Sequence, residues 1–204
     1  MDLKIRFSLS KENKEKGVSL HPFLFYYFLN LLLKRGEIMY QKKLIFLDVD
    51  GVLNPNTNIH MRKQKGEPTV SHLIKLPGDK IYRLKRIVDS TGAEIILSSS
   101  WRIGFNRATM TPSPAVVNLN NQLSKYGISI TDWTPLHSDR NRGNEILHYL
   151  TLFIKNNRYN PKYIIIDDDI GDLLYLHKGH IVHTNTMLGL QDEHVNIAIN
   201  LLNN

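Results

Sequence analysis

Mostly apolar runs of four or five residues alternate along this chain with segments in which apolar residues recur every three or four positions. The runs at 44–47, 93–97 and 163–166 are typical of strands buried on both faces of a parallel sheet. Shorter strand patterns follow at 127–131 and 179–184, and helical periodicity covers 80–90, 115–126, a stretch that ends near 155, and 192–202. This alternation predicts an α/β fold, a doubly wound and mainly parallel sheet with helices on both faces.

Carboxylates directly follow two of these strands. Asp48 and Asp50 come after the first, with Gly51 behind them, and the run 167–169 comes after another. In open α/β sheets, residues just beyond the carboxyl ends of strands line a common crevice. Clustered carboxylates repel one another and are costly to desolvate without a positive partner, so a divalent cation is the simplest one. Gly51 allows the sharp turn and close backbone approach that such a site needs.

Three serines, then Trp101 and Arg102, follow the second strand at the same predicted edge. An arginine there offers a planar, bidentate fork for phosphate. The ring of Trp101 could stack on a base or sugar, or could simply pack in the core.

These stretches resemble a known superfamily. The stretch 48–54 (Asp-Val-Asp-Gly-Val-Leu-Asn) resembles motif I of the haloacid dehalogenase (HAD) superfamily, most of whose members are magnesium-dependent phosphatases. Together with 97–102 (Leu-Ser-Ser-Ser-Trp-Arg), it looks most like the HAD domains associated with RNA-repair proteins. It is also related to the 3′-phosphatase domains of polynucleotide kinase–phosphatases. The resemblance covers residues 42–202 and implies a HAD-like Rossmannoid three-layer sandwich.

The resemblance also implies roles for the acids. Asp48 would attack phosphorus and become an aspartyl-phosphate, and Asp50 would protonate the leaving alcohol and then activate water. Mg²⁺ would be bound by Asp48, by the backbone carbonyl of Asp50 and by Asp168. Asp172 would hold the metal's water shell or orient the basic residue of the site, and Asp167 could share either role.

Motif II of the family is a serine or threonine that bonds a phosphoryl oxygen, and Ser98 is the first choice for it, with Ser99 second. Motif III is a basic residue, usually lysine. No lysine stands at that place, so Arg142 is the best match and Arg140 is the alternative. The substrate is expected to contact Gly51, Ser99, Trp101 and Arg102.

Composition narrows the function classes. The 204 residues include no cysteine, which excludes a cysteine nucleophile, disulfides and cysteine-based metal sites. Net charge is +7, of which residues 39–204 carry +4, a mild excess compatible with an anionic substrate. The polar segment between 54 and 80 is too short for a large cap domain, so we expect a minimal cap and an open crevice suited to a bulky or polymeric substrate. Its basic residues are candidate phosphate contacts: His60, Arg62, Lys63 and Lys65.

Residues 1–38 form an N-terminal extension that differs in pattern from the HAD-like domain expected over 39–204. A lysine-rich start leads to an apolar run over 22–33 that is too short to cross a membrane and lacks a small-residue cleavage site. Three interpretations remain open: a helix packed on the domain, a membrane-surface anchor, or sequence upstream of a true start at Met39.

The sequence therefore predicts a Mg²⁺-dependent phosphomonoesterase whose substrate is a nucleic-acid end, RNA or DNA, with a 3′-phosphate. A nucleotide or small-metabolite phosphatase is the alternative within the enzymes, and a non-catalytic module that binds nucleic-acid ends or a partner is the alternative outside them. We expect a cytoplasmic protein with RNA-repair partner proteins and no stable membrane association. The chain contains no phosphate-binding loop of the form Gly-x-x-x-x-Gly-Lys-Ser/Thr, so the sequence gives no support for a kinase activity.

Overall fold

The computed structural model describes residues 42–104 and 111–204, so the expectations for residues 1–38 lie outside the described part of the chain. A five-stranded sheet runs through it in the order β3-β2-β1-β4-β5, and every neighbouring pair is parallel. The strands are β1 (Lys43–Leu47), β2 (Glu94–Leu97), β3 (Ile130–Trp133), β4 (Lys162–Asp167) and β5 (Ile181–His183). All five overlap the predicted strand patterns, with the largest offset at β3, which begins three residues later than predicted.

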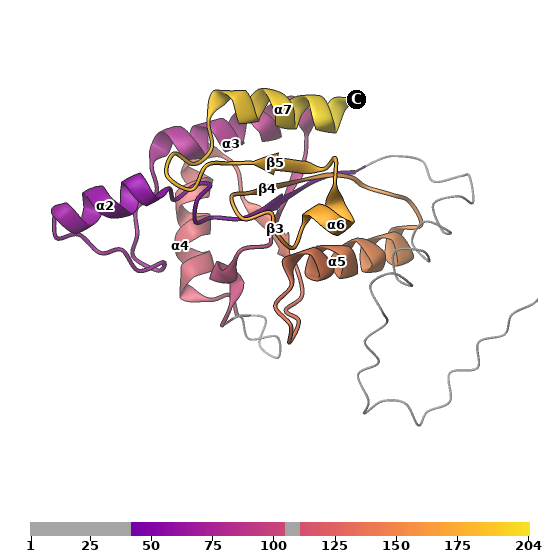
Figure 1. Cartoon of the computed structure of the whole chain (residues 1–204), viewed down its shortest axis with the longest axis horizontal. Coiled ribbons are helices and arrows are strands. Elements are labelled where there is room, and N and C mark those ends of the chain that lie inside the picture. The colour runs from indigo at the N-terminus through magenta and orange to yellow at the C-terminus, as the bar shows by residue number, and fades with distance from the viewer. Residues whose placement is uncertain (1–41, 105–110) are drawn as a thin grey trace, which may run out of the picture. The chain divides into compact units, whose positions relative to one another are not determined.

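Helices cover both faces of this sheet (Figure 1). One layer holds α3 (Gly78–Thr91), α4 (Pro114–Leu123) and α7 (Asp192–Asn203), and the other holds α5 (Arg142–Asn157) and the short α6 (Leu174–His177). Successive side chains of β1 point to opposite faces of the sheet. Ile45 and Leu47 pack in the core beneath α3, α4 and α7, and Leu44 and Phe46 pack in the core beneath α5. The predicted three-layer α/β sandwich is confirmed.

The segment between β1 and α3 contains a single helix, α2 (Asn56–Gln64), so the cap is minimal. Helix α2 was not among the helices that the sequence pattern predicted. The only buried residue of α2 is Asn58. Without an apolar stripe, the helix carries no periodic signal in the sequence.

Helix α3 begins at Gly78, two residues before the start of the predicted periodicity, and its N-cap is Pro77, so Asp79 does not cap it. Asp79 instead lies in the first turn and forms ion pairs with Lys80 and Arg83. At the other end Gly92 adopts a left-handed conformation and ends the helix.

The chain changes direction across the sheet between β1 and β4. From β1 it proceeds to β2 and β3 on one side, and then returns to β4 and β5 on the other. Crevices at such switch points, beyond the carboxyl ends of the strands, are where open α/β sheets bind ligands. Within residues 42–104 and 111–204, none of the helices has the length and apolarity that a bilayer crossing needs.

Candidate active site

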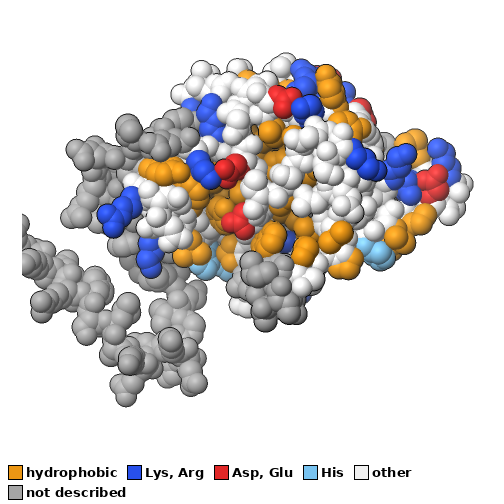
Figure 2. Space-filling model, turned by 180° about the vertical axis from the view of Figure 1, so that it is seen from behind, with side chains coloured by type: hydrophobic (Ala, Val, Ile, Leu, Met, Phe, Trp, Pro, Cys, Tyr) orange, Lys and Arg blue, Asp and Glu red, His pale blue; other side chains and the backbone are white. Residues whose placement is uncertain are grey.

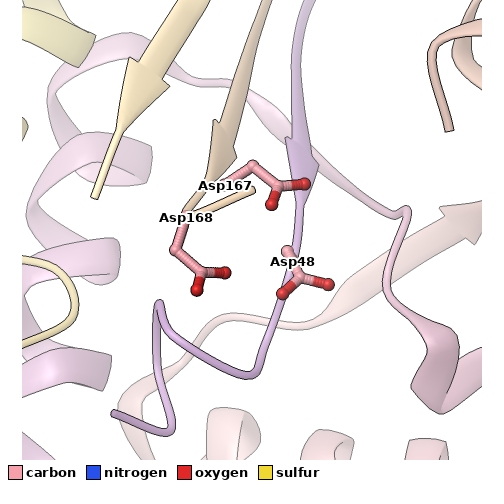
Figure 3. Close-up of side chains that lie close together, drawn as sticks. All are labelled: Asp48, Asp167 and Asp168. Carbon is pink, nitrogen blue, oxygen red and sulfur yellow. The ribbon is translucent and has the colours of Figure 1, made fainter. Parts of the chain in front are cut away.

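Three carboxylates meet at this switch point, Asp48 after β1, Asp167 at the end of β4, and Asp168 (Figure 3). One oxygen of each lies within 4.8 Å of the others. The pairing of the two strands produces this meeting, since Leu47 faces Ile166 in register and the Asp48 amide donates to the Ile166 carbonyl at 3.0 Å. The sheet thus forces acids from two distant parts of the chain together.

Arg142 is the positive partner of this cluster. Its guanidinium lies 3.4 Å from Asp48 Oδ1 and also forms an ion pair with Asp167. Burial alone would lower the pKa of Arg142, but the two carboxylates outweigh it and hold that pKa well above its usual range. Arg142 is therefore a fixed cation at the pH of any assay.

Asp48 is 5% exposed, and its electrostatic balance is unusual. Burial raises its pKa to about 7; Arg142 and a hydrogen bond from the Ser99 hydroxyl oppose the rise, while Asp167 and Asp50 add to it. One guanidinium cannot balance three carboxylates, so the ionised cluster needs a further cation.

The donor atoms suit a hard divalent ion. Carboxylate oxygens are the ligands that Mg²⁺ and Ca²⁺ take in proteins. Gly51 makes room for the third of them: a Cβ there would stand 2.1 Å from Asp168 Cγ, and its φ is +73°. Only glycine lets the turn after β1 approach Asp168 this closely, which gives Gly51 a role in forming the carboxylate cluster.

Asp172 lies apart from this carboxylate cluster. Its Oδ2 accepts from the backbone N–H of Arg142 at 2.6 Å, and its carbonyl oxygen packs against Gly143, where a Cβ would stand 2.3 Å away. Of the two roles expected of Asp172, the structure places it in the one that orients the basic residue. Arg140, the alternative basic residue, lies exposed in the turn before α5 with φ +50°, and Arg142 is the arginine that reaches Asp48.

The two candidate serines differ in their surroundings. Ser99 lies beside Asp48, whose pKa a hydrogen bond from the Ser99 hydroxyl lowers, and that hydroxyl accepts from the Trp101 amide at 3.4 Å. Ser98 is fully buried, and its hydroxyl has no hydrogen-bond partner within the described residues. Which of the two binds a phosphoryl oxygen stays a prediction.

Arg102 does not fit the phosphate contact expected of it. It is 3% exposed, and Nε donates to the Thr134 carbonyl at 3.1 Å. The rest of its guanidinium bonds the carbonyls of Ser98 and Ser99 and forms a buried ion pair with Glu145. Arg102 therefore ties the tips of β2 and β3 to α5 and has no fork turned outward for a substrate.

Of the two roles left open for Trp101, the structure shows packing in the core. The ring is 5% exposed, so it offers no open face for stacking on a base. Its Nε1–H donates to Asp50 Oδ2 at 2.8 Å, and Asn54 Nδ2 donates to Asp50 Oδ1 at 2.6 Å. Asp50 itself is exposed at the mouth of the site.

Asn54 and Glu145 were not among the residues singled out from the sequence. Asn54 lies at the end of the motif I stretch, and an amide four residues after an acid in a tight turn was the available signal. Glu145 interrupts the apolar positions of α5, and an acid on a buried helix face indicates a buried cation nearby.

Comparison with known proteins gives one match. Residues 44–195 match the family model described as "HAD domain in Swiss Army Knife RNA repair proteins". A search of curated proteins and a search of solved structures found no match.

Proposed function

The chain belongs to the family of HAD domains in Swiss Army Knife RNA repair proteins, and on that premise we propose that it is a Mg²⁺-dependent phosphomonoesterase acting on nucleic-acid ends. The family membership makes it a phosphatase-type hydrolase; the metal, the covalent intermediate and the substrate are the proposal. The observation that carries it is the carboxylate cluster of Asp48, Asp167 and Asp168 with Arg142 3.4 Å from the first. Several carboxylates this close together are costly to bury, and such charge clusters occur mainly at functional sites.

In the proposed first step, an oxygen of Asp48 attacks phosphorus as the bond from phosphorus to the ester oxygen breaks. Asp50 gives its proton to that departing oxygen, so the alcohol leaves neutral. Arg142 and the Ser99 hydroxyl lie beside Asp48 and would hold the phosphoryl oxygens. The product is an aspartyl-phosphate on Asp48.

In the second step, Asp50 takes a proton from water, and the water oxygen bonds to phosphorus as the bond to Asp48 breaks. Inorganic phosphate leaves, and Asp48 regains its carboxylate. Asp50 then carries the proton that the next substrate needs, so the two steps balance over one turnover.

The magnesium ion would be held by Asp48, Asp168 and the backbone carbonyl of Asp50, with Asp167 beside them. When bound, it supplies the positive charge that lets an anionic nucleophile approach an anionic phosphate. The all-oxygen donor set and the space that Gly51 leaves for Asp168 fit such an ion.

A nucleic-acid substrate is supported by the description of the family and by the small cap. Helix α2 leaves the crevice open, and Lys63 and Lys65 at its end are exposed. Figure 2 shows basic side chains at the right-hand end of the view, where α2 projects, with an acidic side chain beside them. Arg62 is less available, because it bonds the Pro68 carbonyl and pairs with Glu67.

The test is phosphate release by the full chain, with Mg²⁺ and with chelator. Substrates are 3′-phosphorylated and 5′-phosphorylated oligonucleotides and a panel of mononucleotides. Asp48→Asn removes the nucleophile, and Asp89→Asn makes the same change at an exposed ion pair of α3. Mg²⁺-dependent release from the 3′-phosphorylated oligonucleotide, lost only in Asp48→Asn, is the expected result. Faster release from mononucleotides would indicate a nucleotide or small-metabolite phosphatase. No phosphate release from any substrate by the folded protein would contradict the enzyme and favour a non-catalytic binding module.

A further inference from the structure

Both carboxylate oxygens of Asp50 accept a hydrogen bond, each from a different part of the fold. Trp101 Nε1 lies 2.8 Å from Oδ2, and Asn54 Nδ2 lies 2.6 Å from Oδ1. Trp101 belongs to the short helix η2 (Ser100–Arg102) after β2, whereas Asn54 ends the turn after β1. Two donors at fixed directions leave the carboxyl group little freedom to rotate.

The two donors are themselves held in place. The Trp101 carbonyl accepts from the Ser113 hydroxyl at 2.6 Å, and its ring is buried. Asn54 is 2% exposed, and its Oδ1 accepts from Asn58 Nδ2 at 3.0 Å. Asn58 also donates to the Lys75 carbonyl at 3.1 Å, which extends the hydrogen-bonded chain to the segment before α3.

We propose that Trp101 is a positioning residue that, together with Asn54, holds the Asp50 carboxyl group in line for proton transfer to and from the ester oxygen. The proposal rests on the function proposed above. A carboxylate has about four lone-pair sites, so two donors still leave sites for the transferred proton. The proton moves from Asp50 to the departing oxygen in the first step and returns from water in the second.

A positioned acid matters most when the leaving oxygen is a strong base. An alkyl alcohol, such as a sugar hydroxyl, must be protonated as its bond to phosphorus breaks, whereas a nitrophenolate can leave as an anion. Loss of the indole N–H should therefore impair hydrolysis of the alkyl ester more than that of the aryl ester. A general loss of packing would impair both alike.

Trp101→Phe keeps an aromatic ring in the buried site and removes the N–H donor. The chain has two tryptophans, so Trp133→Phe in β3 is the matched control. The measurement is first-turnover release of the leaving group from a 3′-phosphorylated oligonucleotide and from p-nitrophenyl phosphate, by rapid quench at saturating Mg²⁺.

We expect Trp101→Phe to slow release from the oligonucleotide on the order of tenfold more than release from the aryl ester. Trp133→Phe should leave the ratio of the two rates as in the wild type. Equal losses on the two substrates, or no loss on either, would overturn the proposal. A wild-type protein that cleaves neither substrate would instead contradict the proposed function.

A second measurement tests the contact without any activity and uses Trp101→Phe only to assign the indole resonance. The ¹⁵N-labelled full chain has two indole N–H resonances, one of which Trp101→Phe removes. Asp50→Asn should shift that resonance upfield, because the N–H loses a charged acceptor, and should leave the other in place. Asp89→Asn should move neither. If both indole resonances of folded Asp50→Asn stay at their wild-type positions, the proposal fails whatever the kinetics show.

Discussion

Arg142 bridges the carboxylates of Asp48 and Asp167, so one guanidinium is shared between the tips of neighbouring parallel strands. The start of α5 is anchored to Asp172, beyond β4, through the Arg142 amide. The cation is thus fixed by its backbone as well as by its side chain, and its place does not depend on a bound substrate.

Replacing Arg142 should therefore damage catalysis more than folding. We expect Arg142→Ala to lower kcat on the order of 10²-fold or more, as removal of a preorganised charge donor does in other enzymes. Arg142→Lys keeps the charge and should lose less. Phosphate release at saturating substrate measures both. Lys155→Ala, an exposed residue near the other end of α5, is the control. Wild-type turnover in Arg142→Ala would exclude the proposed role.

Gly51→Ala should disturb the carboxylate cluster. The Cβ of an alanine at this position would lie 2.1 Å from Asp168 Cγ, and the alanine would have to adopt φ +73°. Gly127 has φ +75° with open space around it, so Gly127→Ala carries only the backbone strain, about 1–2 kcal/mol. We expect Mg²⁺ to raise the Tm of wild type and of Gly127→Ala, and to raise that of Gly51→Ala much less. Equal metal-induced shifts in the two glycine variants would contradict this reading of Gly51.

Removal of one partner from the buried ion pair of Arg102 and Glu145 should destabilise the fold strongly. Arg102→Met strands a buried carboxylate, and we expect it to cost about 3–5 kcal/mol in the free energy of unfolding. Combining it with Glu145→Met should cost less than the two single changes added together. Urea denaturation measures all three. Lys85→Met breaks the exposed pair with Asp89 and should cost about 1 kcal/mol or less. Strict additivity in the buried pair would mean that the two side chains do not interact.

The metal-free protein should lose stability as pH rises from about 4 to about 7, in part through Asp48. Its pKa is about 7 in the folded chain against an ordinary value of 3.8, so the folded state binds the proton more tightly than the unfolded state does. The stabilisation by this group is complete below about pH 4 and is lost as pH rises to about 7, on the order of 4 kcal/mol at most.

The difference between wild type and Asp48→Asn isolates this contribution. Burial lowers the pKa of His177 to about 4, so that residue gives a stability change of opposite sign over part of the same range. Chemical denaturation in chelator at several pH values between 4 and 8 is the measurement. We expect the wild-type stability to fall relative to Asp48→Asn as pH rises, and Mg²⁺ to reduce the fall because it favours the ionised carboxylate. A constant difference across this range would show that the Asp48 pKa is not raised.

The strands and the positions of the acids could be predicted because they depend on local patterns. An apolar run such as 44–47 is buried on both faces whatever the rest of the chain does, and in a parallel sheet its carboxyl end lies at the common edge. This reasoning placed Asp48 and Asp168 at one crevice. The resemblance then selected Arg142 among the basic residues near α5.

The choice between adjacent residues could not be made in this way. Ser98 and Ser99 differ by one position, and one position along an extended chain reverses the direction of the side chain. The partners of Trp101 and Arg102 are Asp50 and Glu145, each more than 40 residues away along the chain. The local sequence around Arg102 is the same whether its guanidinium faces a substrate phosphate or a buried glutamate, so the sequence alone could not identify its partner.

The parallel topology has a consequence for how the protein is made. β1 is the middle strand of the sheet, yet its partner β4 and the residues Arg142 and Asp168 leave the ribosome long after Asp48 does. A nascent chain that ends before β4 has one unpaired edge on its central strand, and it lacks Asp167 and Asp168 of the carboxylate cluster as well as Asp172, which holds the Arg142 amide. Completion of the fold and assembly of the site are therefore one late event in synthesis, and chains interrupted before β4 should be recognised by chaperones and proteases as unfolded rather than persist as inactive domains.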